Sequence, residues 1–527
     1  MAAGNSTLHP PRPSAAAFAL RVALALLATC CALWLAAWLT QGSASAWPRF
    51  EDDAYYYLEI ARNVASGHGF TADTLSPTNG FQPLWLWSLV PVAWLTSGDT
   101  TLLHGATQVA VVLIFCLSGG LLCALLRARV GLLPALLGTG VLLFPRFSNV
   151  LLSGMEAGVS VLVLAALTHE LLRGPALASA EPARGDLRAG ALFGLLFLAR
   201  LDSVFIAAAC AGAVALSGLT RRDTPLPARI ARMVRKGLSV FWPMVALAAP
   251  YLVWNVVRFG HLVPISGALK TSHSQLGFMP ENVNGAYAVL LALALAAAAL
   301  ELRRPGDRAL GRVLAALAAG LSLQLLHAVV FMRWAVFSWH FALFIPVGAL
   351  AVGALARAVQ ERWPRAPLRA AVALAALALV AAQAVAISRL PLTFTGAGRE
   401  AGRWVAKSLP PDAVLGMKDS GAFSFFSERR VMNLDGVVNS FEFQEALCRG
   451  ELAEFLARHG VAYIVQHAVP TDVRAGSYES YVQPYPCHFT GPGSELTLRR
   501  DDEVFRGSPY RSYFGDPEQL VIWRIRP

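Results

Sequence analysis

The chain has 527 residues, of which 56% are hydrophobic and only 15% are charged. This composition is typical of a membrane protein and excludes an ordinary soluble domain. A formal net charge of +11 would favour a nucleic-acid partner in a soluble protein, but here the arginines lie between hydrophobic segments, where they orient the chain in the membrane. We therefore expect an α-helical polytopic membrane protein that binds no nucleic acid.

The first 390 residues contain eleven apolar segments with lengths near the roughly 20 residues that cross a bilayer. These expected spans are 15–40, 102–126, 130–147, 150–172, 187–200, 202–218, 238–257, 286–302, 312–332, 335–356 and 369–388. A further segment, 83–97, is apolar but short and rich in tryptophan. We predict that it lies at the interface or re-enters the same side without spanning.

The distribution of arginine supports this list of spans. Arg12 and Arg21 place the N-terminus in the cytoplasm, because positive residues stay on the inner side. If 83–97 does not span, nearly all later arginine clusters also fall on the cytoplasmic side. The polar motifs that do not serve to orient the chain in the membrane then fall on the outer side. Convergence of polar groups on one face of a helical bundle is what a site at the membrane surface requires.

The first outer loop, 41–101, carries three consecutive acids, Glu51, Asp52 and Asp53. Three carboxylates at the edge of a span repel one another, so at least one should have a raised pKa or a cationic partner. The simpler alternative is an acidic start to a short helix, since carboxylates favour the first turn. Apolar residues at helical spacing follow, and glycines and prolines then fold the chain back toward a tryptophan-rich stretch that suits a membrane interface.

Three later motifs place polar residues at the outer ends of spans. Glu156 lies just inside one span end, where an ionisable residue is functional by default. Arg200 and Asp202 form either a local ion pair that reaches to the interface or a contact with a phosphate or sugar. Arg333 and His340 flank a short outer turn, although a lone histidine is more often a satisfied core residue than a ligand.

The composition changes after Arg389, and residues 399–527 alternate strand-like and helix-like runs, at 413–417, 431–434, 441–459, 461–467, 494–500 and 520–525. We predict a small α/β domain outside the membrane there. Segment 468–493 is expected to be a loop, because it is rich in Pro, Gly, Ser and Tyr. Cys448 and Cys487 would be able to form a disulfide if this compartment is oxidising.

The first outer loop resembles that of the GT-C superfamily, the multi-spanning glycosyltransferases that use polyprenyl-phosphate sugars. The resemblance is carried by Asp52-Asp53 directly after the first span, by Gly67-His68-Gly69-Phe70, and by the segment from Asn79 to Pro83. It is similar to the bacterial branch that contains arabinofuranosyltransferase-like and protein-mannosyltransferase-like members. The resemblance implies a multi-spanning domain over 1–390 and an extracytoplasmic α/β domain over 391–527, in the inner or cell membrane of a bacterium.

The same resemblance implies a transferase that moves a pentose or hexose from a polyprenyl-phosphate donor to an extracytoplasmic glycan, lipid or protein. Asp52 matches the first acid of the family's pair and is the predicted base that deprotonates the acceptor hydroxyl. Asp53 is expected to orient the acceptor or, with Asp52, to hold a divalent cation such as Mg²⁺ or Mn²⁺. Lys270 is expected near the lipid phosphate, with a solvated lysine as the alternative. The predicted substrate-binding residues are Tyr55, His68, Asn79, Gln82, Glu156, Arg200, Asp202, Lys270, Arg333 and His340.

A second hypothesis is a non-enzymatic membrane protein that transports or presents lipid-linked sugars. A transporter should place ionisable residues near the middle of the membrane and often shows paired halves. The charged motifs here cluster near one face, and the sequence shows no duplication. The enzyme is therefore the favoured hypothesis, with the sugar and the acceptor left open.

Overall fold

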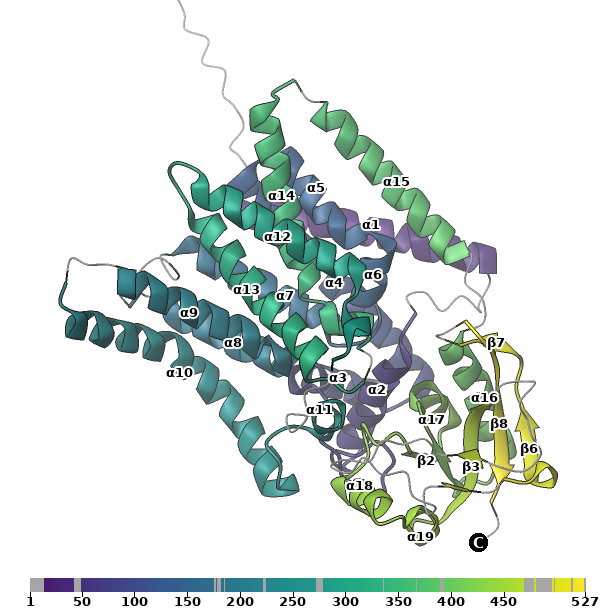
Figure 1. Ribbon diagram of the computed structural model, residues 1–527. Helices are drawn as coiled ribbons and strands as arrows, with labels where there is room; N and C mark the ends of the chain where they lie inside the picture. The colour runs from purple at the N-terminus through teal and green to yellow at the C-terminus, as the bar shows by residue number, and fades with distance from the viewer. Residues whose placement is uncertain are drawn as a thin grey trace, which may run out of the picture.

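The structure is a computed structural model, and it describes residues 14–41, 49–174, 177, 182–183, 185–220, 224–271, 278–334, 336–365, 367–388, 393–468, 478–479, 495–496, 498–512 and 515–525. A bundle of long helices occupies most of the chain, and a small unit containing a β-sheet follows at its C-terminal end (Figure 1).

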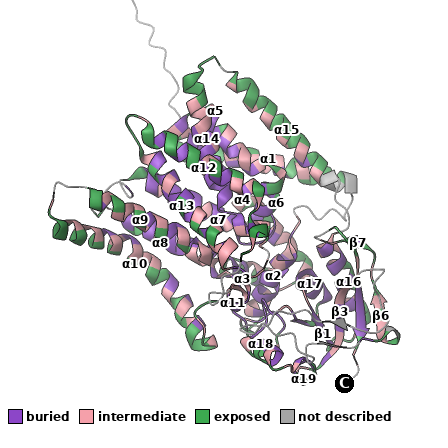
Figure 2. Cartoon of the chain, in the orientation of Figure 1, coloured by how far each residue is buried: buried purple, intermediate pink, exposed green. Residues whose placement is uncertain are grey.

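The bundle is built from helices that follow the apolar segments of the sequence. They are α1 (Ala15–Gln41), α4 (Thr100–Val130), α5 (Leu132–Gly140), α6 (Pro145–Leu151), α7 (Ala157–Arg173), α8 (Asp186–Ala199), α9 (Val204–Thr220), α10 (Leu226–Phe259), α12 (Gly285–Arg303), α13 (Ala309–Val330), α14 (Phe344–Arg362) and α15 (Leu368–Ser388). Among the described residues, eight helices are long and apolar enough to cross a bilayer. Helices α10 and α15 carry many exposed apolar side chains, as expected where a helix faces lipid (Figure 2).

Four of the expected spans differ from the helices that form. The segment 130–147 is divided into α5, a 3-10 turn and α6, which begins at Pro145 because proline has no N–H to continue the preceding helix. The segment 150–172 forms the shorter helix α7, of 17 residues, whereas the span expected over 238–257 lies within the longer helix α10, of 34 residues. The span expected over 335–356 begins only at Phe344, since the preceding residues form the 3-10 turn η5 (Ser338–Phe341).

The first outer loop contributes α2 (Asp52–Ala65) and α3 (Pro83–Leu95). The predicted apolar face of α2 is present, but it is buried in protein between the bundle and the C-terminal unit instead of lying on lipid. Helix α3, with 13 residues, is too short to span, in agreement with the prediction for 83–97. Trp85 is not at a membrane interface: it is buried, and its indole Nε1–H donates to the Gly154 carbonyl at 2.9 Å.

The C-terminal unit confirms the expected α/β class. Its main sheet has the order β2-β1-β3-β8-β6, with β1 parallel to β2 and β3, and β8 antiparallel to β3 and β6. The strands are β1 (Val414–Met417), β2 (Arg430–Asn433), β3 (Val461–Ala468), β6 (Glu503–Arg506), β7 (Tyr510–Arg511) and β8 (Pro517–Arg524), and the helices are α16 (Phe394–Ser408), α17 (Gly421–Ser427), α18 (Phe441–Cys448) and α19 (Leu452–Arg458). A separate pair of short strands, β4 (Tyr478–Glu479) and β5 (Glu495–Leu496), flanks part of the predicted loop.

Four of the runs expected in 399–527 coincide with β1, β2, β3 and β8 to within three residues, whereas α16 and α17 fall outside the expected runs. Cys448 is disulfide-bonded, and Cys487, the partner that the sequence suggested, lies outside the described residues.

Candidate active site

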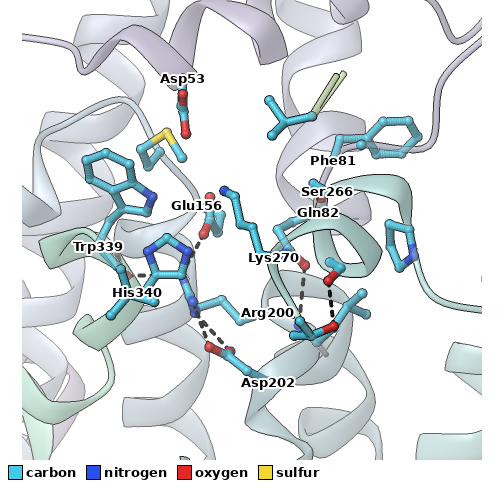
Figure 3. A pocket seen from close by; sticks show the side chains of 18 of the residues that line it. Asp53, Phe81, Gln82, Glu156, Arg200, Asp202, Ser266, Lys270, Trp339 and His340 are labelled. Atoms are coloured by element: carbon cyan, nitrogen blue, oxygen red, sulfur yellow. Dashed lines mark hydrogen bonds and ion pairs between the residues drawn. The ribbon is translucent and has the colours of Figure 1, made fainter. Parts of the chain in front are cut away.

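A cavity of about 220 Å³ lies where the bundle meets the C-terminal unit. Its walls come from α2, the loop before α3, the 3-10 turn η3 (Leu201–Ser203), the short helix α11 (Ile265–Lys270), the end of α13, η5 and the segment after β2 (Figure 3). The predicted site residues that line it are Asp53, Gln82, Glu156, Arg200, Asp202, Lys270 and His340. Parts of the chain up to 287 residues apart in sequence, from Asp53 to His340, therefore meet as predicted.

Asp53 is the carboxylate that faces the cavity from the first turn of α2 (Figure 3). Burial raises the pKa of Asp53 to about 6, Lys270 opposes this shift, and the charges of Asp435 and Glu156 add to it. A carboxylate with a pKa near neutrality can take a proton from a bound hydroxyl and later release it, as a general base must.

Lys270 provides a positive charge in the same cavity. It is the last residue of α11, and its backbone carbonyl accepts a hydrogen bond from the Arg333 N–H at 2.9 Å, which holds the end of this helix against the segment after α13. In the part of the chain that the structure describes, the Lys270 ammonium makes no hydrogen bond or ion pair. Figure 3 shows it pointing into the hollow that Asp53 also faces. It is thus placed to pair with an anion.

Arg200, by contrast, has its donors occupied. Its guanidinium binds the Glu156 carboxylate at 2.6 Å, the Asp202 carboxylate at 2.7 Å and the Trp339 carbonyl at 3.0 Å, while its side chain is 3% exposed. Asp202 also accepts from the Gln324 amide at 2.8 Å. This network ties α7, η3, η5 and α13 together around the cavity floor. Arg200 therefore shapes the site, and its pair with Asp202 is the local ion pair that was one of the two alternatives.

His340 and Gln82 line the cavity in different ways. Burial lowers the pKa of His340 well below its ordinary value, and the charges of Lys270 and Arg200 lower it further, so the ring is neutral at pH 7. Its Nδ1 lies 3.2 Å from the Phe337 carbonyl, which can only accept, so Nδ1 carries the proton and Nε2 is an acceptor. The Gln82 side-chain carbonyl accepts from the Leu201 N–H at 3.3 Å and holds the start of η3.

Asp52 does not line the cavity, although it precedes Asp53 in the chain. Its two carboxylate oxygens accept the backbone N–H groups of Gly421 and Ala422, at 2.7 and 2.8 Å, at the start of α17. A carboxylate is favoured there by the unpaired N–H groups of a helix start. Burial raises the pKa of Asp52 above its ordinary value, against these two hydrogen bonds. Asp52 therefore joins the two units, and the geometry favours Asp53 for the role of base that the sequence assigned to Asp52.

Four predicted substrate-binding residues lie outside the cavity. Tyr55 is buried and stacks on His104, with ring centroids 5.6 Å apart. His68 is exposed on the turn after α2. Asn79 is fully buried and joins Asn255 to the Ile265 N–H, which fixes α11 against α10. The backbone N–H of Arg333 supports Lys270, as described above, but its side chain is not among those that line the cavity.

The sequence missed several lining residues. Tyr57 donates to Glu156 at 3.1 Å and lies four residues after Asp53, so the helical period alone would have placed it on the same face. Tyr56 hydrogen-bonds the C-terminal unit, accepting from the Ser420 N–H at 2.8 Å. Trp339 also lines the cavity, but it lies in an apolar segment that was expected to span the membrane, and no sequence pattern marked it as a site residue.

The C-terminal unit supplies one wall of the cavity through Val437 and Val438. The Asp435 carboxylate accepts the Val437 N–H at 3.0 Å and so fixes the turn after β2. The backbone of this wall contacts Gly80 so closely that a Cβ at position 80 would collide with the Val437 carbonyl. Only glycine permits this contact, and the site is complete only when the two units are joined.

The residues suggested as metal ligands do not fit that role. In the described ranges no three His, Cys, Asp or Glu side chains are grouped to hold an ion. Asp52 has both oxygens engaged by N–H groups, so it cannot form a chelating pair with Asp53.

Comparison with known proteins defines the class of protein that this fold represents. ArnT from Cupriavidus metallidurans, solved with undecaprenyl phosphate, aligns with a TM-score of 0.54 and 14% identity, covering 95% of this chain and 97% of that chain. Its apo structure gives the same TM-score over 96% and 98% of the two chains. The apo oligosaccharyltransferase of Archaeoglobus fulgidus aligns with a TM-score of 0.51 and 13% identity, covering 85% of this chain and 69% of that chain.

The chain is therefore an integral membrane protein with the GT-C fold, and the resemblance read from its first outer loop is confirmed at the level of the fold. A family described as a domain of unknown function (DUF8728) matches residues 387–505, which cover much of the C-terminal unit. A search by sequence among curated proteins finds no match.

Proposed function

We propose that this protein transfers one sugar from a polyprenyl-phosphate donor to a hydroxyl acceptor, with Asp53 as the base. One observation carries the proposal: Asp53, with a pKa raised to about 6, and the ammonium of Lys270, which has no partner among the described residues, face the same cavity. The first can accept the proton that the acceptor loses, and the second can stabilise the phosphate that departs. The shared fold with ArnT, solved with undecaprenyl phosphate, supports a donor of this class.

The proposed reaction is a direct displacement at the anomeric carbon. The acceptor oxygen forms a bond to that carbon as the bond from the carbon to the phosphate oxygen breaks. The acceptor proton passes to the Asp53 carboxylate, and the electron pair of the broken bond leaves with the polyprenyl phosphate, beside Lys270. One carboxylate is sufficient for this step, because no covalent enzyme intermediate forms.

Arg200 acts in this proposal as a positioning residue. Its bonds to Glu156, Asp202 and the Trp339 carbonyl hold three segments of the cavity wall, and removing one partner of a buried pair typically costs about 3–5 kcal/mol. His340 presents an uncharged acceptor, Nε2, which suits a sugar hydroxyl better than a phosphate.

The proposal places the cavity at the outer membrane face, with residues 1–390 as the membrane domain and 391–527 as an extracytoplasmic domain. The support is the positive-inside distribution of arginine, which puts Arg357 and Arg369 on the cytoplasmic side of α14 and α15. A reporter that is active only in the cytoplasm should be silent when fused after residue 527.

The experiment is a transfer assay on the purified full chain in lipid nanodiscs, given a panel of polyprenyl-phosphate sugars and glycan, lipid or peptide acceptors. At least one donor should release polyprenyl phosphate in step with a glycosylated acceptor, and Asp53→Asn should abolish both signals. Movement of a donor across the bilayer without release of its phosphate would instead support a transporter. Release that is equal in wild type and Asp53→Asn would overturn the assignment of the base.

A further inference from the structure

Helix α16, the first element of the C-terminal unit, has two contrasting faces. Its buried face packs on α17 and the sheet through Phe394, Ala397, Ala401 and Val405. Its other face carries positive charges at intervals of four residues, at Arg399, Arg403 and Lys407. Residues four apart lie next to each other on a helix, so these cations form one stripe about two turns long.

A hollow of about 450 Å³ lies along this stripe. Its lining residues are Gly396, Arg399, Glu400, Arg403, Trp404 and Lys407. They bring three cations and one acid to the hollow, and the acid, Glu400, already accepts a hydrogen bond from the Ser508 hydroxyl at 3.0 Å. Within the described residues, none of the three cations forms an ion pair with a carboxylate. Positive charge is therefore concentrated in this hollow.

Aromatic side chains pack beside the cations of this stripe. The Arg403 guanidinium lies 5.4 Å from the centroid of the Phe426 ring, and Trp404 packs against Phe505 at 4.6 Å. Arg399 is half-buried, and burial followed by the charge of Arg403 lowers its pKa, although the Tyr55 hydroxyl acts in the opposite direction. Arg49 is affected in the same way, by burial and then by Arg399. These arginines crowd one another, and an anion between them would relieve that repulsion.

The position of the stripe relative to the membrane suggests where such an anion would come from. Helix α15 ends at Ser388, and α16 begins six residues later at Phe394, a distance of at most about 20 Å for an extended chain. Arg49 follows the end of α1 at Gln41 by eight residues, and α1 packs against α15. Figure 1 shows α16 starting close to the ends of these two helices. The stripe thus begins within about 20 Å of the end of a membrane helix, which is within reach of the lipid head groups.

We propose that Arg399, Arg403 and Lys407 bind the phosphate of an anionic phospholipid, such as phosphatidylglycerol, at the edge of the bilayer. Arginine suits this role because its planar guanidinium can donate two parallel hydrogen bonds to phosphate oxygens. Basic residues near a membrane surface are attracted to anionic lipids, and Trp404 belongs to the residue type that is enriched at that depth. This lipid site is separate from the cavity of Asp53 and Lys270, and it anchors the C-terminal unit to the membrane.

The test is native mass spectrometry of the detergent-purified full chain titrated with phosphatidylglycerol or phosphatidylcholine. Wild type should retain phosphatidylglycerol in preference to phosphatidylcholine. The double variant Arg399→Gln, Arg403→Gln should bind phosphatidylglycerol about thirtyfold more weakly, from the typical contribution of each basic residue near a membrane. The charge-retaining variant Arg399→Lys, Arg403→Lys should keep most of the binding, which separates a loss of charge from a loss of fold.

A matched control is the double variant Arg449→Gln, Arg458→Gln, which removes the same charge from α18 and α19 of the same unit. It should bind phosphatidylglycerol as wild type does. An equal loss in this control would show a non-specific effect of net charge and overturn the proposal. Unchanged phosphatidylglycerol binding in the variant Arg399→Gln, Arg403→Gln would also overturn the proposal. The same holds if millimolar inorganic phosphate displaces phosphatidylglycerol as effectively as added lipid does. None of these outcomes depends on transfer activity.

Discussion

Helix α2 presents neighbouring acids to two different environments. Asp53 faces the cavity and Lys270, whereas Asp52 faces away and accepts the first N–H groups of α17. Burial raises the pKa of both carboxyls, but only Asp53 has room beside it for a substrate. The comparison teaches that a shifted pKa does not identify a catalytic acid or base by itself, because a carboxylate that joins two units shifts in the same direction.

The strongest test of this division is Asp53→Asn. The amide keeps the shape of the side chain but cannot accept the acceptor's proton, so turnover should fall by about two to four orders of magnitude. Single-turnover kinetics with a donor identified in the transfer assay would measure it, with Asp52→Asn as the matched control. If Asp52→Asn were inactive and Asp53→Asn were not, the two roles would be reversed.

The next largest effect is expected for Lys270→Gln, which removes the cation opposite Asp53. Turnover should fall about a hundredfold, as when one stabilising group is removed from a developing negative charge. Lys270→Arg, which keeps the charge, should recover part of the loss. Arg333→Gln serves as the control, because the Arg333 side chain does not line the cavity. Equal losses for Arg333→Gln and Lys270→Gln would mean that the segment, and not the ammonium, is what matters.

The pH dependence of kcat/KM should reveal the same carboxylate. In the proposed reaction Asp53 acts in its unprotonated form, and burial raises its pKa to about 6. Activity should therefore be nearly complete above pH 7 and fall as pH decreases through 6, to about one tenth at pH 5. Stopped assays across pH 5 to 8 would measure the profile. Activity that stays nearly constant from pH 8 down to pH 5 would show that the base is a carboxyl with an ordinary pKa.

The smallest effect on turnover is expected for Asp52→Asn, which should instead destabilise the contact between the two units. An amide can accept only one of the two N–H groups and presents its own N–H to the other, at a cost of about 1–3 kcal/mol. The melting temperature in detergent should fall, while turnover at low temperature should stay within about threefold of wild type. An unchanged melting temperature would remove Asp52 from the interface.

Local sequence was sufficient for much of the fold. Hydropathy located the bundle helices, and the short length of 83–97 predicted that α3 does not span the membrane. The late start of α7 has a physical reason: the residues before it line the cavity, where buried polar partners replace lipid. The pair of Arg200 with Glu156 is one such partner set, and it joins residues 44 positions apart.

The site was predicted less completely, because contacts with residues far along the chain determine which side of α2 faces the cavity. Asp52 meets Gly421 and Ala422 across 369 and 370 residues. No local pattern fixes which of two adjacent acids will face a partner so distant. The sequence showed that an acidic pair stood at the site, and the helical period could have grouped Tyr57 with Asp53, but the orientation of the helix came only from the tertiary structure.

The contact between Gly80 and Val437 also has a consequence for biosynthesis. The wall formed by Val437 and Val438 leaves the ribosome after every bundle helix has been made, so the cavity stays open on one side throughout membrane insertion. Completion of the cavity therefore has to wait for the last part of the polypeptide to fold against the bundle.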